Sequence, residues 1–162
     1  HSFLPVPGRR EFIRELTHIT QNLKNLTPPP SLVLLHLVNA DDVRRRFGRK
    51  ALDDLLTHVC ATIETALHPT DIIGSLGGND FGFILLNADR RLARTKAGKV
   101  VEAIRNQPFL WQGETVTLEA AAGISALEGV SEPEQAVDEA DRDLIGDGKA
   151  PSNPKWDPAD AA

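Results

Sequence analysis

Apolar residues recur every three or four positions over five segments of the chain, which is the spacing of helices with one buried face. These segments predict helices over residues 8–26, 39–48, 50–67, 88–106 and 131–145. The first helix is expected to end before Pro28, because three consecutive prolines cannot continue a helix and favour an extended residue before them. In the fourth helix we expect Leu92 to face inward with the other apolar residues.

Shorter apolar runs bounded by Gly, Asn and Pro predict the strands. They cover residues 31–38, 71–76, 80–86, 109–111 and 115–118, and we expect the last strand to continue through 120–124. The run 31–38 is almost continuously apolar, which is typical of a strand covered on both faces. Gly77-Gly78-Asn79 stands between two of these runs and predicts a tight hairpin turn.

The order of the predicted elements favours an α+β fold with a mostly antiparallel central sheet flanked by helices. The length of 162 residues suits one domain. We expect residues 8–149 to form this domain, with a linker or tag remnant in residues 1–7. Residues 150–162 are rich in Pro, Asp and Ala and are expected to be a linker to a following domain.

The composition of the chain argues against some classes of function. The chain carries 18 Lys and Arg against 23 Asp and Glu, a formal net charge of −5. A dedicated binder of nucleic acid or of a membrane surface would show a basic excess, so neither partner is expected. Cys60 is the only cysteine and is expected to be a small core residue in a protein of the reducing cytoplasm.

Residues 75–81 resemble the signature turn of the GGDEF family, the diguanylate cyclases that join two GTP molecules into cyclic di-GMP. The turn consists of Gly77, Gly78, Asn79, Asp80 and Phe81. Four further segments resemble family motifs in the family's order: residues 7–12, 47–56, 116–124 and 140–144. The resemblance covers Gly8 to about Lys149 and implies a nucleotide-cyclase palm with a ferredoxin-like βαββαβ core.

The chain departs from the family at the metal positions. In the family, an Asp at the end of the first strand and the acidic third residue of the turn hold Mg²⁺ for phosphoryl transfer. Here these positions carry His36 and Asn79, and the next residue is Asp80. His is a poor Mg²⁺ ligand and Asn has no charge, so we expect the metal site to be lost. No catalytic residue, metal or cofactor is then expected, and His36 is instead interpreted as a hydrogen-bonded core histidine.

The family's two nucleotide sites are also altered. In the guanine pocket the family's Asn is replaced by Arg44, whereas Asp53 matches; the arginines 44–46 are typical of a solvated surface. In the inhibitory cyclic di-GMP site Asp71 matches, but His68 replaces an Arg and lacks its planar fork. We interpret His68 and Asp71 as caps of the helix end and strand start. Weak or no binding of GTP and cyclic di-GMP is expected.

Three functions follow from the resemblance. The first is a degenerate, non-catalytic GGDEF domain that regulates, dimerises or docks partners in cyclic di-GMP signalling. It would belong to a longer GGDEF–EAL protein, such as the FimX type that acts in type IV pilus motility and biofilms, with the EAL domain as neighbour. The second is an active cyclase that holds Mg²⁺ through Asp80 and a main-chain carbonyl. The third is a GTP-binding allosteric domain without turnover, using the amides of Gly77 and Gly78.

Overall fold

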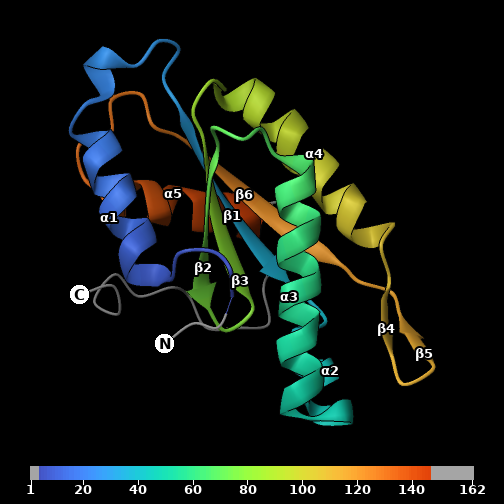
Figure 1. Cartoon of the computed structure of the whole chain (residues 1–162). Coiled ribbons are helices and arrows are strands. Elements are labelled where there is room, and N and C mark those ends of the chain that lie inside the picture. The colour runs from blue at the N-terminus through green and yellow to red at the C-terminus, as the bar shows by residue number, and fades with distance from the viewer. Residues whose placement is uncertain (1–3, 147–162) are drawn as a thin grey trace.

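A four-stranded antiparallel sheet with strand order β2-β3-β1-β6 forms the centre of the computed structural model, which describes residues 4–146 (Figure 1). Its strands are β1 (Ser31–Leu37), β2 (Ile72–Gly77), β3 (Asp80–Leu85) and β6 (Ala120–Ala126). β4 (Phe109–Trp111) and β5 (Glu114–Val116) form a separate two-stranded hairpin. The predicted linker 150–162 lies outside the described residues.

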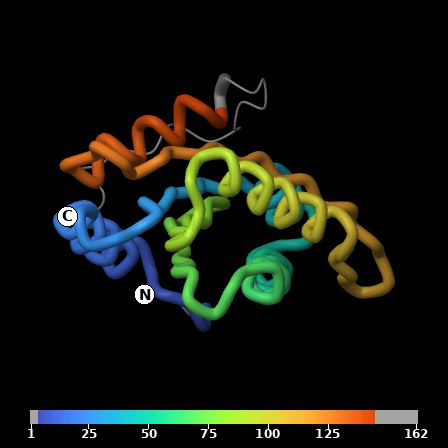
Figure 2. The backbone as a smooth tube through the Cα atoms, turned by 90° about the horizontal axis from the view of Figure 1, so that it is seen from above, coloured from blue at the N-terminus to red at the C-terminus, as the bar shows by residue number. Residues whose placement is uncertain are grey.

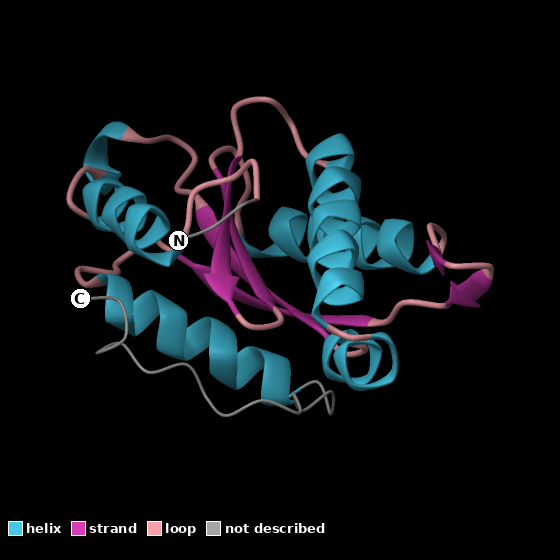
Figure 3. Ribbon diagram, turned by 60° about the horizontal axis from the view of Figure 1, so that its bottom comes forward, coloured by secondary structure: helices cyan, strands magenta, loops and turns pink. Residues whose placement is uncertain are grey.

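Helices cover both faces of this sheet, as Figures 2 and 3 show. They are α1 (Arg9–Thr20), α2 (Ala40–Phe47), α3 (Arg49–Ala66), α4 (Arg90–Arg105) and α5 (Pro133–Gly146). α1 and α5 pack on one face, α3 and α4 pack on the other, and α2 packs against α3. The α+β architecture with an antiparallel sheet is therefore confirmed.

β1 is the centre of this sandwich, and all seven of its residues are buried. Leu32 and Leu34 join the apolar cluster beneath α1 and α5, whereas Val33 and Leu35 join the cluster beneath α3 and α4. Because successive side chains of a strand point to opposite faces, a strand between two helical layers has to be apolar throughout. The run 31–38 is almost continuously apolar because β1 lies between two helical layers.

Two predicted boundaries were wrong. α1 ends at Thr20 instead of running to residue 26, and a 3₁₀ turn (Leu23–Asn25) follows it. The hydroxyl of Thr20 donates to the Thr17 carbonyl, and Nδ2 of the Asn22 side chain donates to the His18 carbonyl. Polar side chains therefore satisfy the last turn and end the helix.

The strand predicted to continue from residue 118 into 120 is also broken, because β5 ends at Val116 and β6 begins at Ala120 in the other sheet. Between them the Glu119 amide donates to the Asn39 side chain and the Glu119 carbonyl accepts from the Val38 amide. These two bonds fix the crossing point of the chain at the end of β1.

Two further expectations, one for Leu92 and one for residues 1–7, also differ from the structure. Leu92 was expected to face inward but is 43% exposed, because it lies at the edge of the buried stripe of α4. Residues 4–7, the described part of the expected linker or tag remnant, pack on the domain: Leu4 and Val6 are buried, and the Pro7 carbonyl accepts a 2.8 Å bond from the Ser75 amide. Residues 4–7 are therefore part of the fold.

Candidate functional site

The β2–β3 turn is held against the end of β1. Gly77 and Gly78 have φ angles of 88° and 57°, left-handed conformations that glycine adopts without steric cost. The carbonyl of Asn79 accepts a 2.8 Å bond from the Leu37 amide. The turn predicted from the Gly-Gly-Asn sequence is confirmed, and it brings the ends of β1, β2 and β3 together.

His36 and Asp80 form a pair across these strands. They lie opposite each other in the register of β1 and β3, and His36 Nδ1 lies 2.8 Å from Asp80 Oδ1. The imidazole is 2% exposed, whereas the Asp80 side chain is 30% exposed. His36 is therefore a hydrogen-bonded core histidine, as its position in an apolar strand indicated. The carboxylate of Asp80 is its partner.

Two buried polar atoms beside this pair have no hydrogen-bond partner among residues 4–146. They are Nε2 of His36 and Nδ2 of Asn79, and the Asn79 residue is 3% exposed. A buried polar group without a partner costs about 1–3 kcal/mol, so folded proteins seldom retain one without a reason. Both cases found in the described chain fall on the two positions that the sequence analysis assigned to the metal site.

Arg9 lies in the segment 7–12 that resembles a family motif, and in the structure it contacts the turn. Its Nε donates a 2.8 Å bond to the Leu76 carbonyl, and its guanidinium lies next to Gly77. This residue was not selected as a site residue because α1 and β2 are far apart in sequence. The only feature of the sequence that could have pointed to this contact is the pair of consecutive arginines at the start of the helix.

The guanine-pocket positions lie on α2 and α3 and do not bond to each other. Arg44 is exposed on α2, whereas Asp53 on α3 faces Arg49, whose Nε lies 3.4 Å from Asp53 Oδ1. The neighbouring Arg45 and Arg46 are 75% and 49% exposed at their side chains. These arginines form a solvated surface, as expected.

His68 and Asp71 form a local capping arrangement at the junction of α3 and β2. Asp71 Oδ2 accepts the His68 amide at 3.1 Å, and its Oδ1 accepts the Leu86 amide at 3.3 Å. The His68 ring contacts the Thr70 hydroxyl at 2.7 Å through Nδ1. Both side chains therefore organise the loop, in agreement with the interpretation as caps.

Within residues 4–146 no three His, Cys, Asp or Glu side chains gather in a way that could hold a metal ion. No helix in the same part of the chain is long and apolar enough to cross a membrane. Cys60 is fully buried, and this burial, with a smaller contribution from the charge of Glu64, raises the pKa of its thiol to about 11. A thiol of this kind is a poor nucleophile at neutral pH.

Comparison with known proteins places this geometry in a family. The family described as diguanylate cyclase, GGDEF domain, matches residues 5–153. The probable diguanylate cyclase DgcE of Escherichia coli is 27% identical over 121 residues, which are 75% of this chain and only 11% of that protein. The chain therefore spans about a tenth of the length of this relative.

Solved structures agree on the fold. The diguanylate cyclase SiaD of Pseudomonas aeruginosa, solved in complex with its activator SiaC, superposes with a TM-score of 0.82 at 20% identity. That match covers 89% of this chain and 55% of SiaD. The GGDEF domain of FimX from the same species superposes with a TM-score of 0.79 at 16% identity, covering 87% and 88% of the two chains. The chain belongs to the GGDEF domain family.

Proposed function

We propose that this domain is a degenerate GGDEF domain that does not synthesise cyclic di-GMP. The observation that carries the proposal is the 2.8 Å contact between His36 Nδ1 and Asp80 Oδ1. The only carboxylate in the signature turn is engaged by a buried imidazole, which stands where the family has a metal-binding Asp.

The donor set does not suit Mg²⁺. This ion binds hard, preferably anionic oxygen ligands in a near-octahedral arrangement. His36 offers a nitrogen, Asn79 offers at most a neutral oxygen, and Asp80 is shared with the imidazole. Freeing Asp80 for a cation would leave both ring nitrogens of a buried histidine without a partner, which adds a further cost to metal binding.

The role that remains for such a domain is regulatory. We propose that it regulates, dimerises or docks partners in cyclic di-GMP signalling, as a cytoplasmic part of a longer GGDEF–EAL protein of the FimX type in pilus motility or biofilm formation. Two observations support this: the chain spans a small part of its relative DgcE, and the likewise similar SiaD was solved bound to a protein activator. The FimX domain shares the fold of this chain.

An activity assay tests the proposal. The purified chain is incubated with GTP and either Mg²⁺ or Mn²⁺, and the products are analysed by mass spectrometry. We expect no cyclic di-GMP. Product that disappears in Asp80→Ala but persists in Arg45→Ala, which changes a solvated surface residue, would contradict it and assign the domain to the active cyclases.

A second candidate, GTP binding without turnover, is favoured by one feature next to the turn. A hollow of about 740 Å³ is lined by residues 4–11 and Arg14, so three arginines contribute to it. Guanidinium groups suit phosphate oxygens and bind them without a metal. Calorimetry with GTP in the presence of a chelator separates this function from a silent scaffold. A heat of GTP binding that is seen with the wild-type chain and absent with Arg14→Ala would favour the GTP-binding function.

A further inference from the structure

α4 concentrates positive charge in an acidic chain. Between Arg90 and Arg105 it contains six Lys or Arg residues and one Glu, a net charge of +5. The whole chain carries −5, so the remainder carries −10. Charge separated in this way creates a local field that the total charge conceals.

Much of this charge does not serve the stability of the domain. Arg94 pairs with Asp143, and Arg105 pairs with Glu102 and Glu119. Four cations form no ion pair with any residue between 4 and 146: Arg90, Arg91, Lys96 and Lys99. Two of them occupy the first turn of α4, where the positive end of the helix dipole disfavours a cation.

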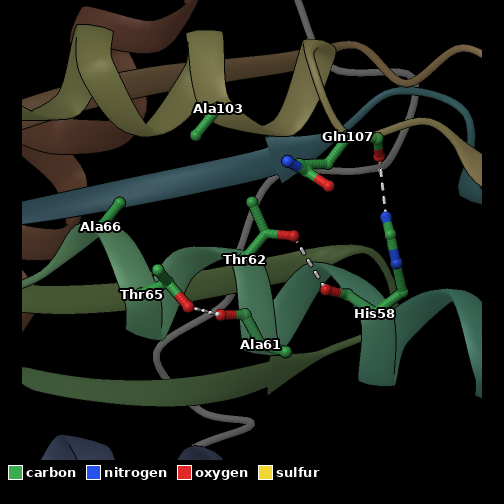
Figure 4. A pocket seen from close by; sticks show the side chains of 7 residues that line it. All are labelled: His58, Ala61, Thr62, Thr65, Ala66, Ala103 and Gln107. Atoms are coloured by element: carbon green, nitrogen blue, oxygen red, sulfur yellow. Dashed lines mark hydrogen bonds between the residues drawn. The ribbon is translucent and has the colours of Figure 1, made fainter.

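Two of these cations, Lys96 and Lys99, lie on the side of α4 that borders a groove between α3 and α4. The groove contains a hollow of about 520 Å³. Figure 4 shows the side chains that line it, most of which are small. The lining residues are His58, Ala61, Thr62, Thr65, Ala66, Ala103 and Gln107. Helical spacing places Lys99 four residues and Lys96 seven residues before Ala103, so both lie on the α4 face that borders the groove. Leu92, 43% exposed, extends this face by another turn.

We propose that this groove binds an amphipathic helix of a partner protein, with apolar side chains in the hollow and acidic side chains against Lys96 and Lys99. The inference rests on the proposed role as an interaction module and names the chemistry of the partner. A volume of this size falls in the range of roughly 300–1,000 Å³ that is typical of ligand pockets, so the hollow has room for the apolar side chains of a bound helix. Positive charge at its border selects acidic residues.

The surroundings favour a helix over other occupants. The backbone groups of α3 and α4 are paired within their own helices, so an extended segment would find no backbone partners there. A helix satisfies its own backbone and needs only an apolar stripe and a charged flank. A bilayer surface is flat and does not enter a groove between two helices.

A peptide titration tests the proposal. The probe is a synthetic amphipathic peptide of about four helical turns, with Leu on one face and Glu along its flank. We expect binding by fluorescence anisotropy, with amide shifts in ¹⁵N spectra centred on Thr62, Thr65 and Ala103. Lys96→Glu combined with Lys99→Glu should weaken binding roughly tenfold or more, as the loss and reversal of two partly exposed ion pairs would give. The matched control, Arg45→Glu with Lys50→Glu, changes the same charge elsewhere and should leave binding intact.

A steric variant separates groove binding from simple charge attraction. Ala103→Arg adds a cation but fills the hollow. If the peptide binds in the groove, this variant should bind it more weakly. If the peptide is held by charge attraction alone, the variant should bind it more tightly. A scrambled peptide of the same composition should bind weakly. Absence of peptide binding overturns the proposal, as does tighter binding by Ala103→Arg. Association with vesicles containing phosphatidylglycerol but not with the peptide would assign the cations to a lipid surface. Cyclic di-GMP synthesis would refute the proposed function and leave this titration unaffected.

Discussion

At the residue scale, the two neighbouring polar side chains Asn79 and Asp80 of the turn differ in what their removal should do. Asp80→Ala leaves the buried His36 imidazole without the partner at its Nδ1, so the free energy of unfolding should fall by about 1–3 kcal/mol. Asn79→Ala removes a donor that has no partner in the described structure, and should change stability by less than about 1 kcal/mol. Urea denaturation of both variants measures the difference. An equal loss in the two would mean that the His36–Asp80 contact contributes nothing.

Cys60 provides a pH-dependent prediction. With a pKa of about 11, roughly a thousandth of the thiol is ionised at pH 8, and the thiol is buried. An aromatic disulfide reagent should therefore react slowly with the native chain and rapidly with the urea-unfolded chain. The pKa in the folded state exceeds the ordinary value of 9.0, so the stability linked to this group is complete below pH 9 and is lost as pH rises towards 11. Rapid labelling of the native chain at pH 8 would contradict the burial.

At the scale of elements, the contact of α5 with β6 depends on a glycine. A Cβ on Gly123 would overlap the carbonyl oxygen of Ala140 and lie 2.8 Å from the Leu144 amide nitrogen, so α5 would have to move away. Gly123→Ala should lower the free energy of unfolding by about 3 kcal/mol. Gly98→Ala on α4 is the matched control, because a Cβ there meets nothing within 4 Å. That variant should gain about 0.5–1 kcal/mol from helix propensity. Similar melting temperatures for the two variants would count against this packing.

Most elements could be predicted because helical and strand periods are properties of local sequence. The end of α1 and the break between β5 and β6 could not, since both depend on polar side chains that bond to the backbone, as Thr20 and Asn39 do. His36 and Asn79 were found from the motif. Their burial and the contact of His36 with Asp80 required the pairing of β1 with β3.

At the scale of the whole molecule, the basic helix α4 shows what net charge leaves out. The net charge of −5 argued against a dedicated binder of nucleic acid or of a membrane surface, and it did not reveal that α4 alone carries +5. A total charge hides a local excess when acids elsewhere compensate for it. Arg94 shows how these parts are joined: it donates to both oxygens of Asp143, and Asp143 accepts the Ile124 amide, so α4, α5 and β6 meet at one carboxylate.

The loss of the metal site can be tested through the stability of the whole chain. His36→Asp combined with Asn79→Glu restores the acids of the family and places three carboxylates around the turn, counting Asp80. Without metal their mutual repulsion should lower the melting temperature, and Mg²⁺ should raise it again, because a ligand that binds only the folded state stabilises it by mass action. The wild-type chain should melt at the same temperature with and without Mg²⁺. His36→Asn with Asn79→Gln, which adds no charge, should be equally indifferent. Equal stabilisation of the wild type and the restored variant by Mg²⁺ would mean that His36 and Asn79 do not prevent metal binding.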